Sequence, residues 1–308
     1  MAEATAAPQE HAPEHAAPHA RWPALAMLVF GACVIGFSGA FTRLTGTGPA
    51  AAGFWRLFTA LPLLAIMARG ATGELGRPTR IALVAGLLFA LDLGFWHYGL
   101  KYTSVGVSTV LSNLTPVVVT AFAWVVFKQR PRTLFLLAMA VSVGGAWMMG
   151  IGKGSGAPAL DAPLGNALSL ITAFWYALYF LAVSQARKSM AASRLMLWSS
   201  LVGAPCLLVA AGLLGEQLWP TTLAEAAACV GLGLIHIGGQ GSIAWAMGRL
   251  PASLASVVVL VQPVVATYAG WVLFGEALGP LQAAGAAVAL AGVVLAQWAS
   301  RPKPGVSA

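Results

Sequence analysis

The twelve-residue stretch PVVVTAFAWVVF, from Pro116 to Phe127, returns later in the chain as PVVATYAGWVLF, from Pro263 to Phe274. Seven of the twelve positions are identical, and the offset between the copies is a constant 147 residues. A match of this length is hard to attribute to chance. It predicts a chain built from two similar halves, which we place at residues 22–151 and 162–299.

The composition indicates the environment of these halves. Of 308 residues, 59% are hydrophobic and 8% are charged, against about 25% charged in ordinary soluble domains. A soluble surface needs far more charge, so the composition excludes disorder and disfavours a soluble enzyme. The cysteines, Cys33, Cys206 and Cys229, lie in apolar runs and have neither a disulfide framework nor a metal-ligand spacing. We predict a polytopic membrane protein without a bound metal.

Ten runs are apolar and long enough to cross a bilayer, for which about 20 residues suffice. They leave only short loops, so we predict an all-α fold of ten transmembrane helices, five in each half. The segment 1–21 is rich in Ala, Pro, His and Glu and is predicted to be a disordered tail; residues 300–308 form a second tail. The ten runs are 22–43, 49–69, 80–101, 104–127, 132–151, 162–186, 194–215, 223–247, 251–275 and 278–299.

The basic residues predict the orientation of these spans. Thirteen of the 17 lysines and arginines fall on one side, and only Arg43, Lys101 and Lys153 fall on the other. Because Lys and Arg in short loops stay cytoplasmic, we expect both termini in the cytoplasm. The net charge of +8 is thereby explained by topology, and nucleic-acid binding is not expected.

An odd number of spans in each half makes the two halves antiparallel across the membrane. The loops agree: Lys128, Arg130 and Arg132 follow the first copy of the repeat, whereas Glu276 and no base follow the second. We therefore predict an inverted repeat. Such repeats are typical of secondary transporters, which bind substrate near the midplane between the halves.

Several motifs resemble a known family. The stretch LKYTSVGVS from Leu100 to Ser108, the mid-helix Pro116 and Pro263, and Phe274-Gly-Glu276 resemble the two EamA-type halves of the drug/metabolite transporter superfamily. The resemblance covers roughly residues 22–299. The many intramembrane aromatics make the chain most similar to the bacterial aromatic amino acid exporters. The first span lacks an acid, which counts against the small cationic-drug branch.

The resemblance implies a bacterial inner-membrane exporter whose spans one, three, four, six, eight and nine line a central cavity. We expect a small-molecule substrate, a lipid-bilayer environment and a monomer or weak homodimer. The chain has no nucleotide-binding Gly-x-x-x-x-Gly-Lys-Ser/Thr motif, and no cofactor is predicted. Transport would be gradient-driven or facilitated.

Polar and amphipathic groups within the spans are the candidate substrate-binding residues, because burying them in a bilayer is costly. Asp92 shares a helical face with Trp96, Trp175 shares one with Tyr179, and His236 shares one with Gln240. Each has a structural alternative, such as a hydrogen bond between helices or aromatic packing. The full set is Asp92, Trp96, Asn113, Trp175, Tyr179, His236, Gln240 and Gln262.

Pro116 and Pro263 are candidates for a kink or gating role. Each lacks a donor and is expected to free the carbonyl four residues back, at Ser112 and Val259. Transporters expose backbone to substrate at such breaks, although a kink can also serve packing alone. Arg56 falls inside the second run, and we interpret it as reaching toward the headgroups or pairing locally, with gating as the alternative.

Taken with an apolar, Trp-rich interior, these residues favour export of neutral, aromatic or large apolar amino acids by alternating access. Phosphate substrates would need a central Arg or Lys, and none is expected there. The alternatives are export of amines, nucleosides or drugs, and a scaffold or receptor role.

An enzyme is not expected. Gly36-Phe-Ser38-Gly39 matches the motif of intramembrane serine hydrolases, which is a remote alternative because the nucleophile needs a histidine base within reach.

Overall fold

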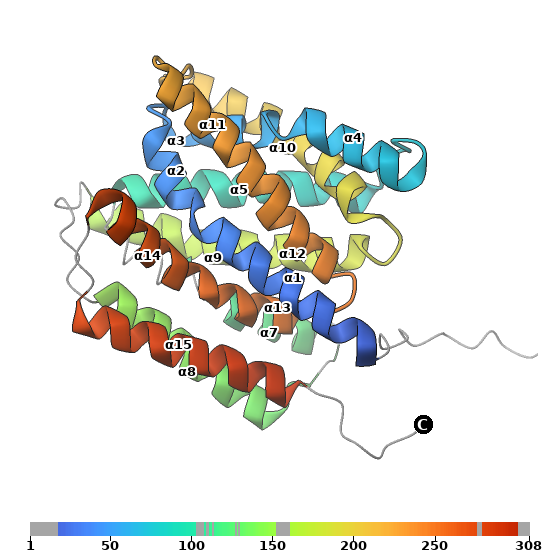
Figure 1. Ribbon diagram of the computed structural model, residues 1–308, viewed down its shortest axis with the longest axis vertical. Coiled ribbons are helices and arrows are strands. Elements are labelled where there is room, and N and C mark those ends of the chain that lie inside the picture. Colours follow the sequence, from blue (N-terminus) through green and yellow to red (C-terminus); the bar gives the residue numbers. More distant parts are fainter. Residues whose placement is uncertain are drawn as a thin grey trace, which may run out of the picture.

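The computed structural model describes residues 18–102, 108, 111–112, 114–126, 128, 130–151, 161–275 and 279–300. Every regular element in this part of the chain is a helix (Figure 1). Two short irregular helices interrupt the series, a π-helix at His236–Gln240 and a 3₁₀ helix at Val259–Val261. The α-helices are α1 Pro18–Gly36, α2 Ser38–Leu44, α3 Pro49–Phe58, α4 Leu61–Thr72, α5 Arg80–Tyr102, α7 Thr115–Val125, α8 Thr133–Ile151, α9 Ala162–Ala186, α10 Ala192–Leu213, α11 Leu223–Ile235, α12 Gly241–Ala246, α13 Ala252–Val258, α14 Gln262–Phe274 and α15 Pro280–Ala299.

Eight helical segments of the described chain are long and apolar enough to cross a membrane. Two shorter apolar helices, Thr115–Val125 and Thr133–Met148, lie where we predicted the fourth and fifth spans. The prediction of a polytopic helical membrane protein is consistent with these helices, while the count of ten and the inverted repeat stay predictions. The eight segments are Arg21–Leu44, Pro49–Ala71, Arg80–Tyr102, Pro163–Ala186, Ala192–Leu213, Leu223–Ala246, Ala252–Phe274 and Pro280–Ala299.

Local chemistry sets several helix ends. Pro49 opens α3, where its fixed φ and missing N–H are tolerated. Thr222 and Glu225 form a capping box at the start of α11. Gly73 and Gly275 end α4 and α14 in the left-handed conformation, with φ of 76° and 64°. The helix ends are thus encoded locally.

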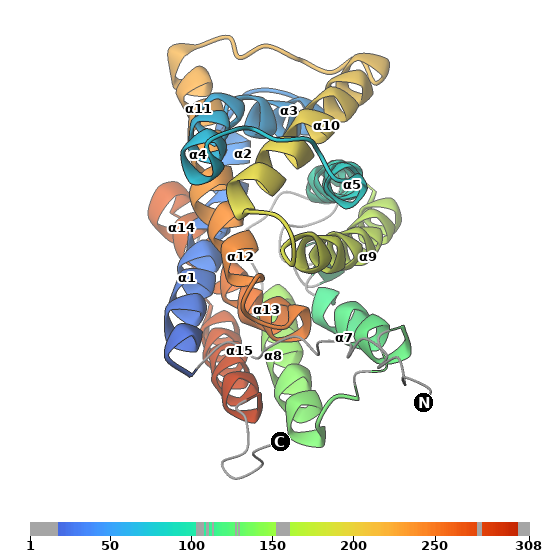
Figure 2. The same cartoon turned by 90° about the vertical axis from the view of Figure 1, so that its right-hand side faces the viewer.

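Small residues allow the helices to pack closely. Helices α8 and α15 lie side by side (Figure 1). A Cβ atom on Gly145 would come within 2.2 Å of the Ala289 nitrogen, and one on Gly292 within 2.5 Å of the Ser142 nitrogen. Helices α5 and α9 form a second close pair (Figure 2). Close approach of small residues is the usual way in which membrane helices associate.

Four of the membrane segments are broken in their interior. The first breaks at Phe37 between α1 and α2, and the second at 59–60 between α3 and α4. The Leu223–Ala246 segment contains the π-helix His236–Gln240, and the Ala252–Phe274 segment contains the 3₁₀ turn Val259–Val261. Such irregular turns often mark functional positions in a helix.

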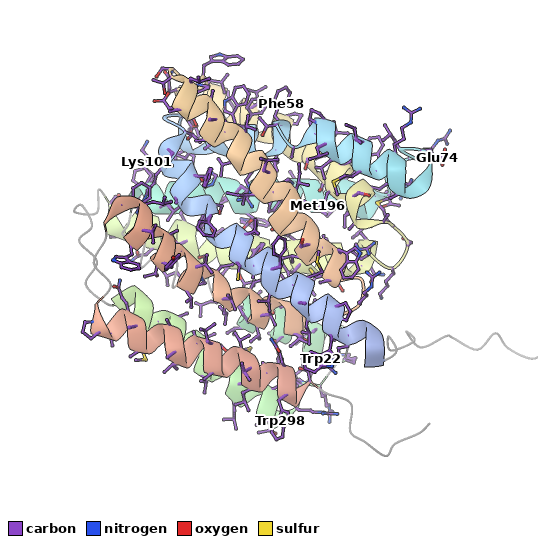
Figure 3. All side chains as sticks on the ribbon, viewed as in Figure 1. Trp22, Phe58, Glu74, Lys101, Met196 and Trp298 are labelled. Carbon is purple, nitrogen blue, oxygen red and sulfur yellow. The ribbon has the colours of Figure 1, made fainter. Side chains whose placement is uncertain are left out.

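The bundle has two ends. At one, which we call the Glu216 end, the Gly48 N–H donates to the Gln217 carbonyl between the two loops that follow α2 and α10. At the other, the Arg187 end, Arg187 follows α9 and contacts α12. Lys101 lies toward the Glu216 end, and Glu74 lies toward the Arg187 end (Figure 3).

Candidate substrate-binding cavity

A cavity lies between the broken helices. The space between its walls that holds no protein atoms, open solvent included, amounts to about 1260 Å³. Its wall runs from Gln240 and Gln262, beside the π and 3₁₀ turns, to Arg43 and Phe274. Arg43 is exposed and lies over the Phe274 ring, 5.4 Å from its centroid. The cavity therefore extends toward the Glu216 end.

Two charged side chains line the interior of this cavity. Arg56 of α3 is 3% exposed and Asp92 of α5 is 6% exposed. The two groups attract each other electrostatically. Arg56 therefore does not reach toward the headgroups, and the expectation that no central arginine exists is wrong. The cause is the rotation of α3, which turns Arg56 inward.

Aromatic rings form the apolar part of the wall. Phe89, Trp96 and Tyr176 line the cavity. The Arg56 guanidinium lies 5.7 Å from the Phe89 ring centroid, a cation–π distance. Behind the wall, Phe89 stacks on Tyr179 at 4.6 Å and on His236 at 5.4 Å. The rings thus position Arg56 from one side and leave its other side toward the cavity.

Two glutamine amides complete the polar part of the wall. Gln240 donates to the Tyr179 hydroxyl at 3.3 Å, and both Gln240 and Gln262 lie beside the Tyr176 hydroxyl. The Nε2 atom of Gln262 is buried without a hydrogen-bond partner. The Tyr176 hydroxyl is an acceptor within its reach, and a ligand that accepts from this amide would complete its hydrogen bonding.

The structure brings six of the ten predicted site residues together in the cavity wall. These are Asp92, Trp96, Gln240, Gln262, Pro116 and Pro263. Tyr179 and His236 are buried behind the wall, at 1% and 0% exposure. The His236 Nε2 atom lies 3.0 Å from the Ser200 hydroxyl, which ties the π-helix to α10.

The remaining two predicted residues are Trp175 and Asn113. Trp175 packs against Phe95, with ring centroids 6.4 Å apart, and is not among the lining residues. Its neighbour Tyr176 lines the wall instead, because one residue along a helix is a rotation of about 100°. Asn113 lies outside the described residues.

The prolines do not leave free carbonyls as expected. The Val259 carbonyl accepts from the Gln262 N–H within the 3₁₀ turn, and the Ser112 carbonyl accepts from the Thr115 hydroxyl at 2.8 Å. Local rearrangement therefore satisfies the groups that Pro263 and Pro116 would otherwise leave unpaired. The side chains of the cavity wall, not these carbonyls, are its available polar groups.

The cavity is closed toward the Arg187 end. Ile243 and Ala244 of α12 are fully buried there, as are Val257 and Val258 of α13. Arg187 adds a polar closure, because its Nε donates to the Ala244 carbonyl at 2.9 Å and its Nη1 donates to the Met190 carbonyl. Among the described residues, those that line the cavity lie toward the Glu216 end, and these four side chains and Arg187 pack the other end.

Comparison with known proteins decides the family. The EamA-like transporter family matches residues 22–151 and again residues 163–298. The chain belongs to the EamA-like transporter family. An uncharacterized transporter of Archaeoglobus fulgidus is 26% identical over 275 residues, which cover 88% of this chain and 95% of that protein. A solved crystal structure with 19% identity has a TM-score of 0.74 and covers 89% of this chain and 98% of its own.

Membership in the EamA-like family makes this chain a multi-pass membrane transporter of a small molecule. The family points to a transporter and not to an enzyme. Ser38 lines the cavity, while the His97 Nδ1 atom pairs with the Pro49 carbonyl at 2.8 Å and the His236 Nε2 atom pairs with Ser200.

The wall residues of this EamA-like protein that the sequence did not lead us to assign to the site include Arg56, Phe89 and Tyr176. The signal for Arg56 was present, since it is the one arginine that lies inside a predicted apolar run and not at its end. Helical spacing also carried a signal for the two aromatics, because Phe89 lies three residues before Asp92 and Tyr176 lies four residues after Thr172.

Proposed function

We propose that this EamA-like protein exports small neutral amino acids with an aromatic or large apolar side chain across the bacterial inner membrane. The observation that carries the proposal is the cavity wall itself. Aromatic rings of Phe89, Trp96 and Tyr176 stand beside a small set of polar groups. A cavity of mixed apolar and polar lining suits an amphipathic metabolite.

The distribution of Lys and Arg supports an orientation in which the Arg187 end is cytoplasmic and both termini lie on that side. In that orientation the cavity opens to the outside. The structure then corresponds to the state in which an exporter releases its substrate, and alternating access requires a second state open at the Arg187 end.

The broken helices support alternating access. Breaks at Phe37, 59–60, His236–Gln240 and Val259–Val261 lie in four segments around the cavity. A helix that is already interrupted can change direction with little loss of hydrogen bonding. We propose that the two predicted halves, 22–151 and 162–299, rock against each other about these breaks.

Counterflow in proteoliposomes tests this function. Vesicles are loaded with unlabelled tryptophan, phenylalanine, leucine, tryptamine or adenosine, and uptake of labelled tryptophan is followed. We expect tryptophan, phenylalanine and leucine to stimulate uptake. In parallel, uptake of labelled tryptamine and of labelled adenosine is followed into vesicles loaded with the same unlabelled compound. Counterflow of tryptamine or adenosine without counterflow of any amino acid would replace the amino acid proposal with the amine or nucleoside alternative. Empty liposomes are the control.

A further inference from the structure

Arg56 and Asp92 stand apart from the other charged residues of the described chain by their burial. Both are more than nine-tenths buried, both line the cavity, and they come from different helices, α3 and α5. A single charge inside a membrane protein is costly, and two opposite charges on one cavity wall partly compensate each other. The pair gives the cavity a positive and a negative site within one small volume.

The hydrogen bonding of these two groups is incomplete. The Nε atom of Arg56 is buried and has no hydrogen-bond partner. Among the residues that the structure describes, the Asp92 carboxylate accepts no hydrogen bond from a side chain or backbone N–H. Buried charges without hydrogen bonds are strongly unfavourable. Both groups are thus poised for a ligand that brings charge and hydrogen bonds.

The neighbours of the pair set the size and shape of that ligand. Trp96 lines the wall one helical turn beyond Asp92, and Phe89 lies against Arg56. The Gln262 Nε2 atom, also without a partner, lies beside Tyr176 on the same wall. A ligand with a compact charged head and a planar apolar body meets all of these groups.

We propose that Arg56 and Asp92 bind the two ends of a zwitterion: the guanidinium of Arg56 holds the α-carboxylate, and the carboxylate of Asp92 holds the α-ammonium, of a free amino acid. This inference rests on the proposed amino acid transport and assigns its recognition site. An α-amino acid neutralises both buried charges at once and leaves no net charge behind. The guanidinium fork also matches a carboxylate in a bidentate arrangement.

The same geometry excludes incomplete ligands. A primary amine pairs with Asp92 but leaves Arg56 without an anion. A carboxylic acid pairs with Arg56 but leaves Asp92 without a cation. Sites with built polar groups reject analogues that lack a partner, because the buried group is then unpaired. The zwitterion, and not the aromatic ring alone, is the recognised feature.

Three indole compounds separate these contributions: tryptophan, tryptamine and indole-3-propionate. Their labelled uptake into proteoliposomes is compared for the native protein, Arg56→Gln, Asp92→Asn and the matched control Arg249→Gln. Arg249 is exposed at the Arg187 end, where it lies 3.7 Å from the Trp245 ring centroid. We expect the native protein and Arg249→Gln to prefer tryptophan over either analogue by about tenfold or more.

The two site variants change the preference in opposite directions. Arg56→Gln lowers tryptophan uptake about 30-fold or more and leaves tryptamine uptake within about threefold. Asp92→Asn lowers tryptophan uptake similarly and leaves indole-3-propionate within about threefold. Size-exclusion profiles confirm that each variant is folded. If Arg56→Gln does not fold, Arg56→Lys replaces it, and this variant keeps the charge and shows a smaller loss of tryptophan uptake.

The outcomes distinguish the site from the function. If uptake of all three compounds falls equally in both variants, the zwitterion site is overturned and the proposal of amino acid export remains. If the native protein takes up tryptophan no faster than the two analogues, the zwitterion site is likewise overturned. A native protein that carries none of the three compounds overturns the proposed function and the site together.

Discussion

Arg56 is buried and Arg187 is partly buried, and their surroundings differ. Arg187 donates to the Ala244 carbonyl at 2.9 Å and to the Met190 carbonyl. A Cβ on Gly248 would lie 2.6 Å from its Nη2 atom, so the site is filled. Burial lowers the pKa of Arg187, and Arg249 lowers it further, yet an arginine stays charged. Arg56 instead has an Nε atom without a partner and faces a cavity.

This contrast separates a structural arginine from one that is available to a ligand. The protein itself supplies the acceptors of Arg187, so that side chain contributes to closing its end of the bundle. The acceptors of Arg56 are incomplete until a substrate arrives. Matched substitutions at the two positions test the distinction.

The largest effect is expected for Arg56→Met. The variant should lower tryptophan counterflow about 100-fold, because truncating one partner of a buried charge pair costs 2–5 kcal/mol. In the double variant Arg56→Met/Asp92→Leu, which leaves no uncompensated charge, the unfolding free energy should change by less than about 1 kcal/mol, since apolar side chains often replace a whole buried ion pair without loss. Counterflow and thermal unfolding in detergent measure the two quantities. Equal losses of transport and stability would remove the contrast with Arg187.

The next effect is expected for Arg187→Met, which keeps the apolar stem and removes both hydrogen bonds. Hydrogen bonds to a charged donor contribute about 1.5–3 kcal/mol each, so we expect a loss of about 2 kcal/mol in thermal unfolding. The Arg187 end should also open more often. The rate at which a thiol reagent labels a cysteine introduced at position 257 (Val257→Cys) reports that opening. If both the labelling rate and the stability are unchanged, Arg187 does not contribute to closing this end.

A smaller effect is expected for Glu216→Gln. The Glu216 carboxylate accepts from the Ala50 N–H at 3.2 Å, from the Ala51 N–H at 2.9 Å and from the Tyr98 hydroxyl. It therefore holds the start of α3, the helix that carries Arg56. Loss of a capping charge costs about 1 kcal/mol, and we expect tryptophan counterflow to fall about threefold.

The matched control for that substitution is Glu225→Gln. Glu225 lies against Gly46 in the loop before α3, but the hydrogen bonds that it accepts come from Thr221 and Thr222 and not from α3, so transport should change little. Equal transport in the two glutamate variants would show that the position of α3 does not depend on Glu216.

The smallest effect is expected for Ser200→Ala. The variant removes the partner of the His236 Nε2 atom, which lies behind the cavity wall. Leaving one buried group unpaired costs about 1 kcal/mol or somewhat more, visible in thermal unfolding. Counterflow of tryptophan should stay within about twofold. A large loss of transport would show that His236 contributes to substrate binding and not only to packing.

The helical membrane segments could be predicted from the sequence because a long apolar run has few alternatives in a bilayer. The run predicted at 80–101 is the helix Arg80–Tyr102, and the run at 223–247 is the segment Leu223–Ala246. The breaks inside these segments were not fully predicted. The π-helix at His236–Gln240 depends on packing against α1, where a Cβ on Gly31 would lie 2.6 Å from the Gly239 carbonyl.

Helix rotation limited the prediction of the site. Asp92 and Trp96 were found because one acid in an apolar helix points to a cavity regardless of rotation. Arg56 was misread because a long side chain near a helix end can reach either the interface or the interior. In α9, Thr172 lies four residues before Tyr176 and marks the face that lines the cavity, whereas the prediction named Trp175 on the neighbouring face. The contacts that each side chain makes depend on tertiary packing, which a single sequence does not specify.

A structure of the protein with bound tryptophan tests the central claim most directly. The account predicts the α-carboxylate within about 3 Å of the Arg56 guanidinium, the α-ammonium at Asp92, and the indole ring against Trp96. Tryptophan bound with its ring at Arg56, or bound instead in the apolar hollow lined by Leu91, Phe95 and Leu207, would contradict it.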